Sequence, residues 1–199
     1  ILYLDKKFLY SSLINSYINA KYFIQINKVY LNINSENQSI KNHNLDKELL
    51  VSLTSYYKRF DTLPLVLDSL QRQTTKPDKI ELWIENKDIK FLPKKISKFR
   101  NVNLRVCEND LFSYKKIIPA LIENQNRYIA TFDDDVIYSN KCLEQLVNKA
   151  KIYPEDIIAN RVHKIKIINN VPDNYNNWDL NNTDNHRLNF FTGVGGVLY

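Results

Sequence analysis

Three consecutive aspartates, Asp133-Asp134-Asp135, directly follow an apolar stretch of strand type at residues 128–132. Adjacent carboxylates repel one another, and a folded protein tolerates them best when a cation or a donor-rich ligand neutralises them. Side chains at i and i+2 of an extended chain point to the same side, so we expect Asp133 and Asp135 to share one hard cation in a D-x-D pattern. Mg²⁺ and Mn²⁺ take one or two protein carboxylates together with water and phosphate oxygens. The triplet therefore predicts a divalent metal site, and the alternative is a solvated acidic turn.

Basic residues at two places predict an anionic ligand nearby. Lys115-Lys116 is expected to open a helix over residues 116–125. A lysine at a helix N-terminus opposes the helix dipole, which favours a phosphate or a nucleotide edge at this position. Lys58-Arg59, after the first predicted strand, supports the same inference. The alternative for both pairs is ordinary surface charge.

All three glycines of the chain, Gly193, Gly195 and Gly196, fall within four residues. Glycine is the residue that tolerates positive φ and close approach of the backbone to another group. The segment is therefore expected to contain such a backbone conformation or to border a ligand, and the alternative is a hairpin turn.

The elements that must position these residues alternate between strands and amphipathic helices. Such alternation predicts an α/β domain with a mostly parallel central sheet, in which ligands bind beyond the carboxyl ends of the strands. Residues 54–59, 85–86, 108–116 and 133–135 are then expected at one edge of the sheet. The predicted strands are 49–54, 79–84, 103–107, 128–132 and 156–159, and the predicted helices are 62–74, 116–125 and 139–151.

Composition limits the class of protein. The 199 residues are 44% hydrophobic and 25% charged, which excludes wholesale disorder. No apolar run approaches the roughly 18 residues that span a bilayer. Cys107 and Cys142 are too few for a disulfide scaffold and lack metal-ligand spacing, so a reducing, cytoplasmic location is expected. The net charge of +6 could attract nucleic acid, but no basic-aromatic motif or zinc spacing accompanies it, and no nucleic-acid partner is predicted.

The chain divides into an uninformative beginning and a domain. Residues 1–45 are interpreted as an N-terminal extension, or the end of a preceding unit, with a polar linker. Residues 46–199 are interpreted as an incomplete nucleotide-binding domain that is truncated at the C-terminus, because the glycine segment resembles the middle of a fold. Residues 169–187 show no periodicity and are expected to form a lid, a binding loop or a disordered stretch.

Six segments together resemble bacterial GT-A-type, family-2-like glycosyltransferases, which build surface polysaccharide and lipopolysaccharide. The resemblance covers residues 48–199 and implies a GT-A-like (nucleotide-diphospho-sugar transferase) Rossmann-like sandwich. The segments that carry it are 51–55 followed by Arg59, 70–74, 76–80, 114–116, 131–135 and 193–199.

The resemblance also implies residue roles. The donor would be a nucleotide-diphosphate sugar and the acceptor a glycan or lipid-linked molecule, with a divalent cation (Mn²⁺ or Mg²⁺) held by Asp133 and Asp135. The glycines Gly193, Gly195 and Gly196 would border the acceptor. Inverting members use an Asp or Glu as general base downstream of that segment, so the base is expected beyond Tyr199 and these 199 residues alone are expected to be inactive. The implied donor-binding residues are Thr54, Ser55, Arg59, Glu85, Lys115, Asp133 and Asp134.

Two other functions stay open at this point. A nucleotidyltransferase also uses metal-bound aspartates, but it normally needs a glycine-rich loop after the first strand, and residues 55–60 contain no glycine. A non-catalytic carbohydrate-binding or assembly module is the second.

The basic charge fits peripheral attachment to the inner face of a bacterial inner membrane. The donor sugar, nucleotide, acceptor, metal and oligomeric state are not determined by the sequence.

Overall fold

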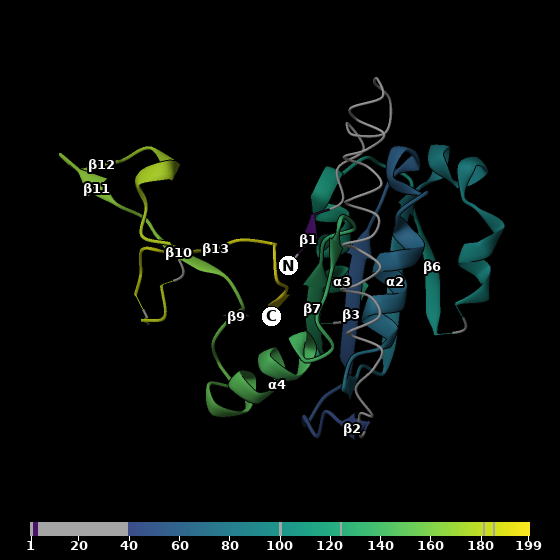
Figure 1. Cartoon of the computed structure of the whole chain (residues 1–199), viewed down its shortest axis with the longest axis horizontal. Helices are drawn as coiled ribbons and strands as arrows, with labels where there is room; N and C mark the ends of the chain where they lie inside the picture. Colours follow the sequence, from purple (N-terminus) through teal and green to yellow (C-terminus); the bar gives the residue numbers. More distant parts are fainter. Residues whose placement is uncertain (1, 4–39, 100, 124, 181, 185) are drawn as a thin grey trace, which may run out of the picture.

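The computed structural model describes residues 2–3, 40–99, 101–123, 125–180, 182–184 and 186–199 (Figure 1). Across these residues the largest sheet has six strands in the order β6-β5-β3-β7-β14-β9. Strands β6, β5, β3 and β7 are parallel, and β14 runs antiparallel to both of its neighbours. This confirms the predicted α/β fold with a mostly parallel central sheet. The strands are β3 Leu49–Thr54, β5 Lys79–Glu85, β6 Val102–Cys107, β7 Tyr128–Phe132, β9 Ile158–Ala159 and β14 Val197–Leu198.

The register of the parallel strands brings their carboxyl ends to one edge of the sheet. Leu53 of β3 pairs with Leu82 of β5 on one side and with Phe132 of β7 on the other. The strands that end at Thr54, Glu85 and Phe132 therefore finish close together. The first five residues of β3 are buried, as expected for a parallel strand covered on both faces.

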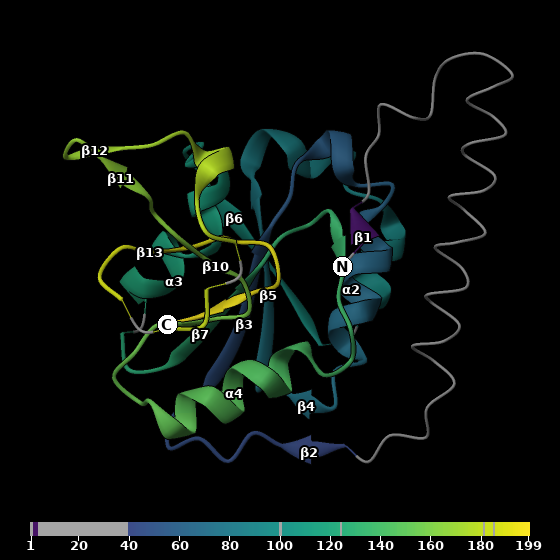
Figure 2. The same cartoon turned by 60° about the vertical axis from the view of Figure 1, so that its left-hand side comes forward.

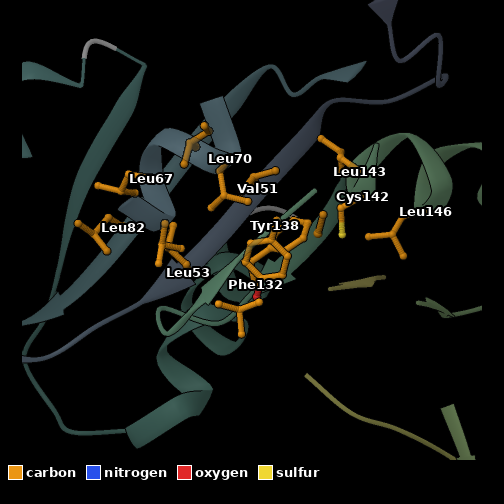
Figure 3. Close-up of a cluster of buried hydrophobic side chains, with 14 of the residues drawn as sticks. Val51, Leu53, Leu67, Leu70, Leu82, Phe132, Tyr138, Cys142, Leu143 and Leu146 are labelled. Atoms are coloured by element: carbon orange, nitrogen blue, oxygen red, sulfur yellow. The ribbon is translucent and has the colours of Figure 1, made fainter. Parts of the chain in front are cut away.

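Helices cover the two faces of this sheet (Figure 2). Helices α2, Leu63–Gln71, and α4, Cys142–Ile152, place their apolar faces against the larger cluster, which Figure 3 shows around Phe132 and Tyr138. Helix α3, Ile118–Glu123, covers the opposite face over a smaller cluster. Helices in the described part of the chain lack the length and apolar character that crossing a bilayer requires. The smaller cluster consists of Leu50, Trp83, Cys107, Ala120 and Ile129.

The segment before the domain is partly attached to it. Strand β2, Lys41–Asn42, pairs in parallel with β4, Thr75–Lys76, whereas the sequence placed Lys41–Asn42 in a polar linker and predicted no strand at residues 75–76. The Lys41 backbone N–H also donates to the carbonyl of Thr74 at 2.8 Å. The two strands pair because β4 offers an open edge to β2. Hydrophobic periodicity in the sequence cannot reveal such an edge. Strand β1, Leu2–Tyr3, pairs with β8, Val136–Ile137. Most of the N-terminal extension that the sequence predicts at residues 1–45 lies outside the described residues.

Residues 160–180, 182–184 and 186–192, which we call the arm, lie between β9 and β14 and project from the sheet (Figure 1). Its hairpin turns at Asn169 and Asn170, which have φ of 50° and 61°. The lid, loop or disordered stretch expected at residues 169–187 is thus partly regular structure, with strands too short for periodicity to reveal. The arm contains β10 Val162–Lys164, β11 Ile167–Ile168, β12 Val171–Pro172, the 3₁₀ turn η6 Tyr175–Asn177, and β13 Asn189–Phe191.

Contacts between aromatic rings hold the arm together. The ring of buried His163 lies 5.5 Å from that of Tyr175, and Trp178 bridges Tyr175 and Phe190 with ring centroids at 5.1 and 5.5 Å. Strands β10 and β13 pair antiparallel beneath these rings. A contact of 5.9 Å between the rings of Phe191 and Tyr199 joins the arm to the sheet.

Candidate functional site

A pocket of about 440 Å³ opens beyond the carboxyl ends of β3, β5 and β7. The parallel sheet predicts a ligand site at this edge. All seven residues that the sequence predicted to bind a donor lie in its wall, although they come from segments up to 80 residues apart. They are Thr54, Ser55, Arg59, Glu85, Lys115, Asp133 and Asp134; the other lining residues are Tyr56, Tyr57, Lys87, Asp88, Asp110, Phe112, Ser113, Lys116 and Phe132.

The aspartate triplet is matched by cations from two other elements. The Lys116 ammonium lies 2.5 Å from Asp133 Oδ1. The Arg59 guanidinium bridges Asp134 and Asp135, with Nη1 at 2.6 and 2.8 Å from their carboxylates. The charge that adjacent carboxylates would otherwise accumulate is thereby offset inside the protein.

The geometry of the triplet differs from the extended chain that the sequence suggested. Asp134 and Asp135 lie in a turn between β7 and β8. Asp133 therefore faces Lys116 while Asp135 faces Arg59, and Asp135 does not line the pocket. Burial raises the pKa of Asp135, as do the neighbouring aspartates, while Arg59 acts in the opposite direction. The prediction that Asp133 and Asp135 hold one metal stays a prediction, and the carboxylates that jointly face the pocket are Asp133 and Asp134.

Two buried oxygens in the pocket wall have no hydrogen-bond partner among the described residues, Asp134 Oδ2 and Ser55 Oγ. Asp134 is 6% exposed and Ser55 is 3% exposed. An unsatisfied buried polar atom costs about 1–3 kcal/mol, and a ligand, an ion or a water molecule can complete its hydrogen bonding. Both oxygens are therefore available to a polar ligand in this pocket.

Buried aromatic packing fixes the end of β7. Tyr138 is fully buried, and its ring meets that of Phe132 edge to face at 4.7 Å. Its hydroxyl accepts a hydrogen bond of 2.8 Å from the Asp133 backbone N–H. Burial raises the pKa of Tyr138 well above its usual value, so the hydroxyl stays protonated. The backbone that carries the first aspartate is thus held rigidly.

A second group of acids and lysines also lines the pocket. Lys115 is 4% exposed, and its ammonium lies 2.6 Å from Asp110. A hydrogen bond from Lys115 lowers the pKa of Asp110. Lys87 lies 2.7 Å from Glu85, and buried Asp88 accepts a 3.3 Å hydrogen bond from the backbone of Tyr57.

The two lysines of Lys115-Lys116 do not open a helix. They end the 3₁₀ helix η5, Phe112–Lys116, and each is neutralised by a different aspartate. The sequence named Lys115 as a donor-binding residue but not Lys116, Asp88 or Asp110, although Lys116 and Asp110 were expected at this edge of the sheet. Asp88 and Asp110 follow β5 and β6 along the chain, and that position at the carboxyl edge was the available signal. Only the tertiary structure shows that Lys116, and not Lys115, contacts the aspartate triplet.

The glycine segment packs on β7. Gly195 and Gly196 have φ of 99° and 89°, which confirms the predicted positive φ. A Cβ at Gly193 would lie 3.1 Å from both carboxylate oxygens of Asp133. Gly195 accepts hydrogen bonds from the Cys142 thiol at 3.0 Å and from the Asn160 amide at 2.8 Å. The segment thus leads directly into inner strand β14, and its first glycine adjoins the pocket.

The fold and site define a class: an α/β protein of the GT-A type with an acidic and basic pocket at the carboxyl edge of its sheet. The sequence profile described as glycosyl transferase family 2 matches residues 53–196. The chain belongs to this family. No curated protein sequence shows a significant match.

Several solved structures are similar in part. The S. aureus TarS 1–349 structure is 16% identical with a TM-score of 0.44, covering 56% of this chain and 34% of its own. The structure of TarS 1–349 in complex with UDP is 16% identical with a TM-score of 0.46, and the match covers 61% of this chain and 36% of that one. A mannosyltransferase, PcManGT from Pyrobaculum calidifontis, in complex with GDP-Man and Mn²⁺, is 11% identical with a TM-score of 0.45, and the match covers 71% of this chain and 44% of that one. The chain therefore spans less than half the length of each of these structures.

Proposed function

We propose that this chain is part of a glycosyltransferase that moves a sugar from a nucleotide-diphosphate donor to a glycan or lipid-linked acceptor with inversion. Membership of the family and the chemistry of the pocket support this proposal. The observation that carries it is the convergence of all seven predicted donor-binding residues in one pocket at the carboxyl edge of the sheet. Of the functions left open by the sequence, this one uses both the acidic and the basic residues of the pocket.

The pocket offers groups for both the base and the diphosphate of a nucleotide. Asp88 and Glu85 supply acceptor oxygens for N–H groups of a base, and Ser55 has a buried hydroxyl available for a sugar or base contact. Lys116 and Arg59, which also line the pocket, supply positive charge for a diphosphate. Preorganised cations that face the developing charge of a leaving group are an effective source of rate acceleration.

The two aspartates of the triplet that line the pocket fit a divalent cation. Asp133 and Asp134 both face the pocket with hard oxygen ligands, and Asp134 Oδ2 has no partner among the described residues. Mg²⁺ and Mn²⁺ need only one or two such carboxylates when phosphate oxygens complete the coordination. When bound, the cation would neutralise the charge that builds on the departing diphosphate. We propose Asp133 and Asp134 as its neighbours and keep Asp135 as a candidate that substitution must test.

The chain's own residues then orient the donor. Lys116 holds the Asp133 carboxylate, and Arg59 holds Asp134 and Asp135, so the acids cannot rotate freely. We assign none of the pocket carboxylates as the general base, because each forms an ion pair or a backbone hydrogen bond. Gly193 borders Asp133, and we propose that the acceptor approaches along the glycine segment. Location in the cytoplasm and a role in bacterial surface polysaccharide synthesis complete the proposal.

Calorimetric titration with UDP, GDP and CMP, each with and without Mn²⁺, tests the donor site. One of these nucleotides should bind, and Mn²⁺ should strengthen its binding. Asp133→Asn should remove most of the metal-dependent gain, whereas the exposed control Asp156→Asn should keep it. Asp135→Asn then shows whether the third aspartate contributes. Absence of binding by all three nucleotides, or a metal effect untouched by Asp133→Asn, would contradict the proposal.

A further inference from the structure

The segment between β5 and β6 presents only positive charge to solvent. It comprises the 3₁₀ helices η3, Asn86–Phe91, and η4, Lys94–Lys98. Asp88 is the one acidic residue of the segment and is buried at 3% exposure, so its charge is directed inward. Ile96 is 5% exposed and packs with the core, which turns the lysines outward. The exposed lysines of the segment are Lys87, Lys90, Lys94, Lys95 and Lys98.

Most of this charge is not neutralised by the protein. Lys87 contacts Glu85, but Lys90, Lys94, Lys95 and Lys98 form no ion pair within the part of the chain that the structure describes. The same holds, among the described residues, for Lys58 on the neighbouring 3₁₀ turn η2, Tyr57–Arg59. Inside the pocket, by contrast, Lys115 and Lys116 are each paired. We call Lys58, Lys90, Lys94, Lys95 and Lys98 the lysine flank.

Exposed aromatic rings lie beside the lysine flank. Phe91 is 53% exposed and Tyr57 is 46% exposed, with their ring centroids 5.5 Å apart. The Lys90 ammonium lies 5.0 Å from the centre of the Phe91 ring, and that of Lys58 lies 5.8 Å from the Tyr57 ring. Aromatic rings combined with lysines, whose apolar stems bury while the charge stays in water, suit the boundary between water and lipid.

The flank adjoins the pocket mouth. Tyr56, Tyr57 and Phe112 line the pocket and are 40%, 46% and 76% exposed. The segment leads into β6, which is one edge of the central sheet, while the arm leaves β9 at the other edge (Figure 1). The basic and aromatic surface and the arm are therefore on opposite sides of the molecule.

We propose that the lysine flank, with Phe91 and Tyr57, docks on a membrane surface that contains anionic lipid. A basic residue near such a surface contributes about 1 kcal/mol, and clusters of four to eight basic residues are typical of segments that bind anionic lipid. The exposed rings favour lipid over a purely hydrophilic polyanion, because they gain from leaving water. The inference deepens the proposed function: docking here would bring a lipid-linked acceptor to the pocket mouth.

Sedimentation with lipid vesicles tests the proposal. The protein should bind vesicles that contain phosphatidylglycerol, should not bind vesicles of phosphatidylcholine alone, and should be released by salt. The combined variant Lys90→Gln, Lys94→Gln, Lys95→Gln, Lys98→Gln should bind at least about tenfold more weakly. Phe91→Ser should weaken binding further.

A matched control removes the same charge elsewhere. Substituting glutamine for the exposed lysines Lys47, Lys141, Lys149 and Lys151 lowers the net charge equally but leaves the flank intact. This control should bind vesicles within about twofold of the wild type, because surface charges beyond a Debye length contribute little. Equal loss in both variants, binding to neutral vesicles, or binding to RNA and sulfated polysaccharide without binding to vesicles would each overturn the proposal.

Nucleotide titration on the same preparations separates this inference from the proposed function. None of Lys90, Lys94, Lys95 and Lys98 lines the pocket, so nucleotide affinity should be the same in the flank variant and the wild type. Vesicle binding without nucleotide binding would contradict the transferase alone. Nucleotide binding without vesicle binding would contradict the membrane flank alone.

Discussion

Gly193 lies directly against the carboxylate of Asp133, where an added Cβ would be 3.1 Å from both oxygens and 3.3 Å from the ammonium of Lys116. The two residues are brought together because β14 pairs with β7, with Val197 opposite Thr131. Three separate parts of the chain therefore meet at one carboxylate. A side chain at position 193 would therefore press on this carboxylate.

Gly193→Ala should weaken nucleotide binding while leaving the fold intact. The new methyl group would displace the ends of two side chains, which can move by a few tenths of an ångström at small cost in stability. That movement misplaces the carboxylate, so we expect roughly tenfold weaker nucleotide affinity in calorimetry, by the sensitivity of binding sites to small displacements. Unchanged affinity would show that Asp133 does not contact the ligand.

Gly196→Ala, in contrast to Gly193→Ala, should reduce the stability of the fold, and it serves as the comparison. Its Cβ would lie 2.5 Å from the buried ring of Phe132, and the residue has a φ of 89°. Overpacking and a left-handed backbone each cost about 1–3 kcal/mol. Urea denaturation should therefore show a loss of at least about 2 kcal/mol in the free energy of unfolding. A loss no larger than that of Gly193→Ala would contradict the packing seen here.

Arg59→Met should destabilise the protein. Arg59 is the cation that contacts both Asp134 and Asp135, and Asp134 is buried. Removing one partner of a buried pair costs about 3–5 kcal/mol, and the 35% exposure of the Arg59 side chain reduces the expected loss to about 2 kcal/mol. Thermal denaturation measures it. If Asp134→Asn in the same background recovers most of the loss, the uncompensated carboxylate is its cause.

Both cysteines should be unreactive in the folded protein. Cys142 is 6% exposed and Cys107 is 7% exposed, and burial raises the pKa of the Cys142 thiol to about 11. Burial also raises the pKa of Cys107. At pH 8 only about one Cys142 thiol in a thousand would be ionised, and the thiolate is the reactive species. Ellman's reagent should therefore modify neither thiol until denaturant is added, and a rapid reaction in the native state would refute the burial.

The pairing of Glu144 with the N-terminal segment should give a pH-dependent contribution to stability. Its carboxylate accepts hydrogen bonds from Lys41 at 2.8 Å and Thr74 at 2.9 Å, and the bond from Lys41 lowers its pKa most. The folded state therefore holds the charged form better than the unfolded state does. The resulting stability is present above the unfolded pKa of about 4.3 and is lost as the pH falls through the lower folded value.

Glu144→Gln should accordingly cost about 0.5–1 kcal/mol at pH 7 and almost nothing near pH 3. Urea denaturation at the two pH values measures the difference, with the exposed Glu155→Gln as a control that should show no such dependence. A Glu144→Gln deficit that persists in acid would mean that shape, rather than charge, accounts for the contact.

The elements that the sequence predicted well are those whose side chains repeat over many residues. Helix α2 shows its apolar face in Leu63, Val66, Leu67 and Leu70, and all four are buried. Strand β3 has the predicted bounds because a continuous apolar run can be satisfied only inside a covered sheet. The β4 strand and the short strands of the arm were missed, because two or three residues are too few for a period to be recognised.

In the candidate site, too, some features could be predicted from the sequence and others could not. Asp133 and Arg59 were identifiable because each follows a predicted strand at the carboxyl edge of the sheet, and Thr54 because it ends one. The partner of each side chain was not identifiable: Lys116 rather than Lys115 contacts Asp133, and the turn at Asp134 separates Asp133 from Asp135. Likewise, the sequence showed the excess positive charge, but only the burial of Asp88 made the surface of residues 86–98 uniformly basic.

The amino-acid sequence by itself determined the α/β class and the order of the main strands and helices, because hydrophobic periodicity is a local property. The candidate donor-binding residues came from the resemblance of the sequence to a known family. The tertiary structure alone decided which charges neutralise each other, which carboxylates face the pocket, and where unpaired lysines gather. Those outcomes depend on distances between segments far apart in the chain, and pairwise charge interactions change with every ångström of separation and with burial.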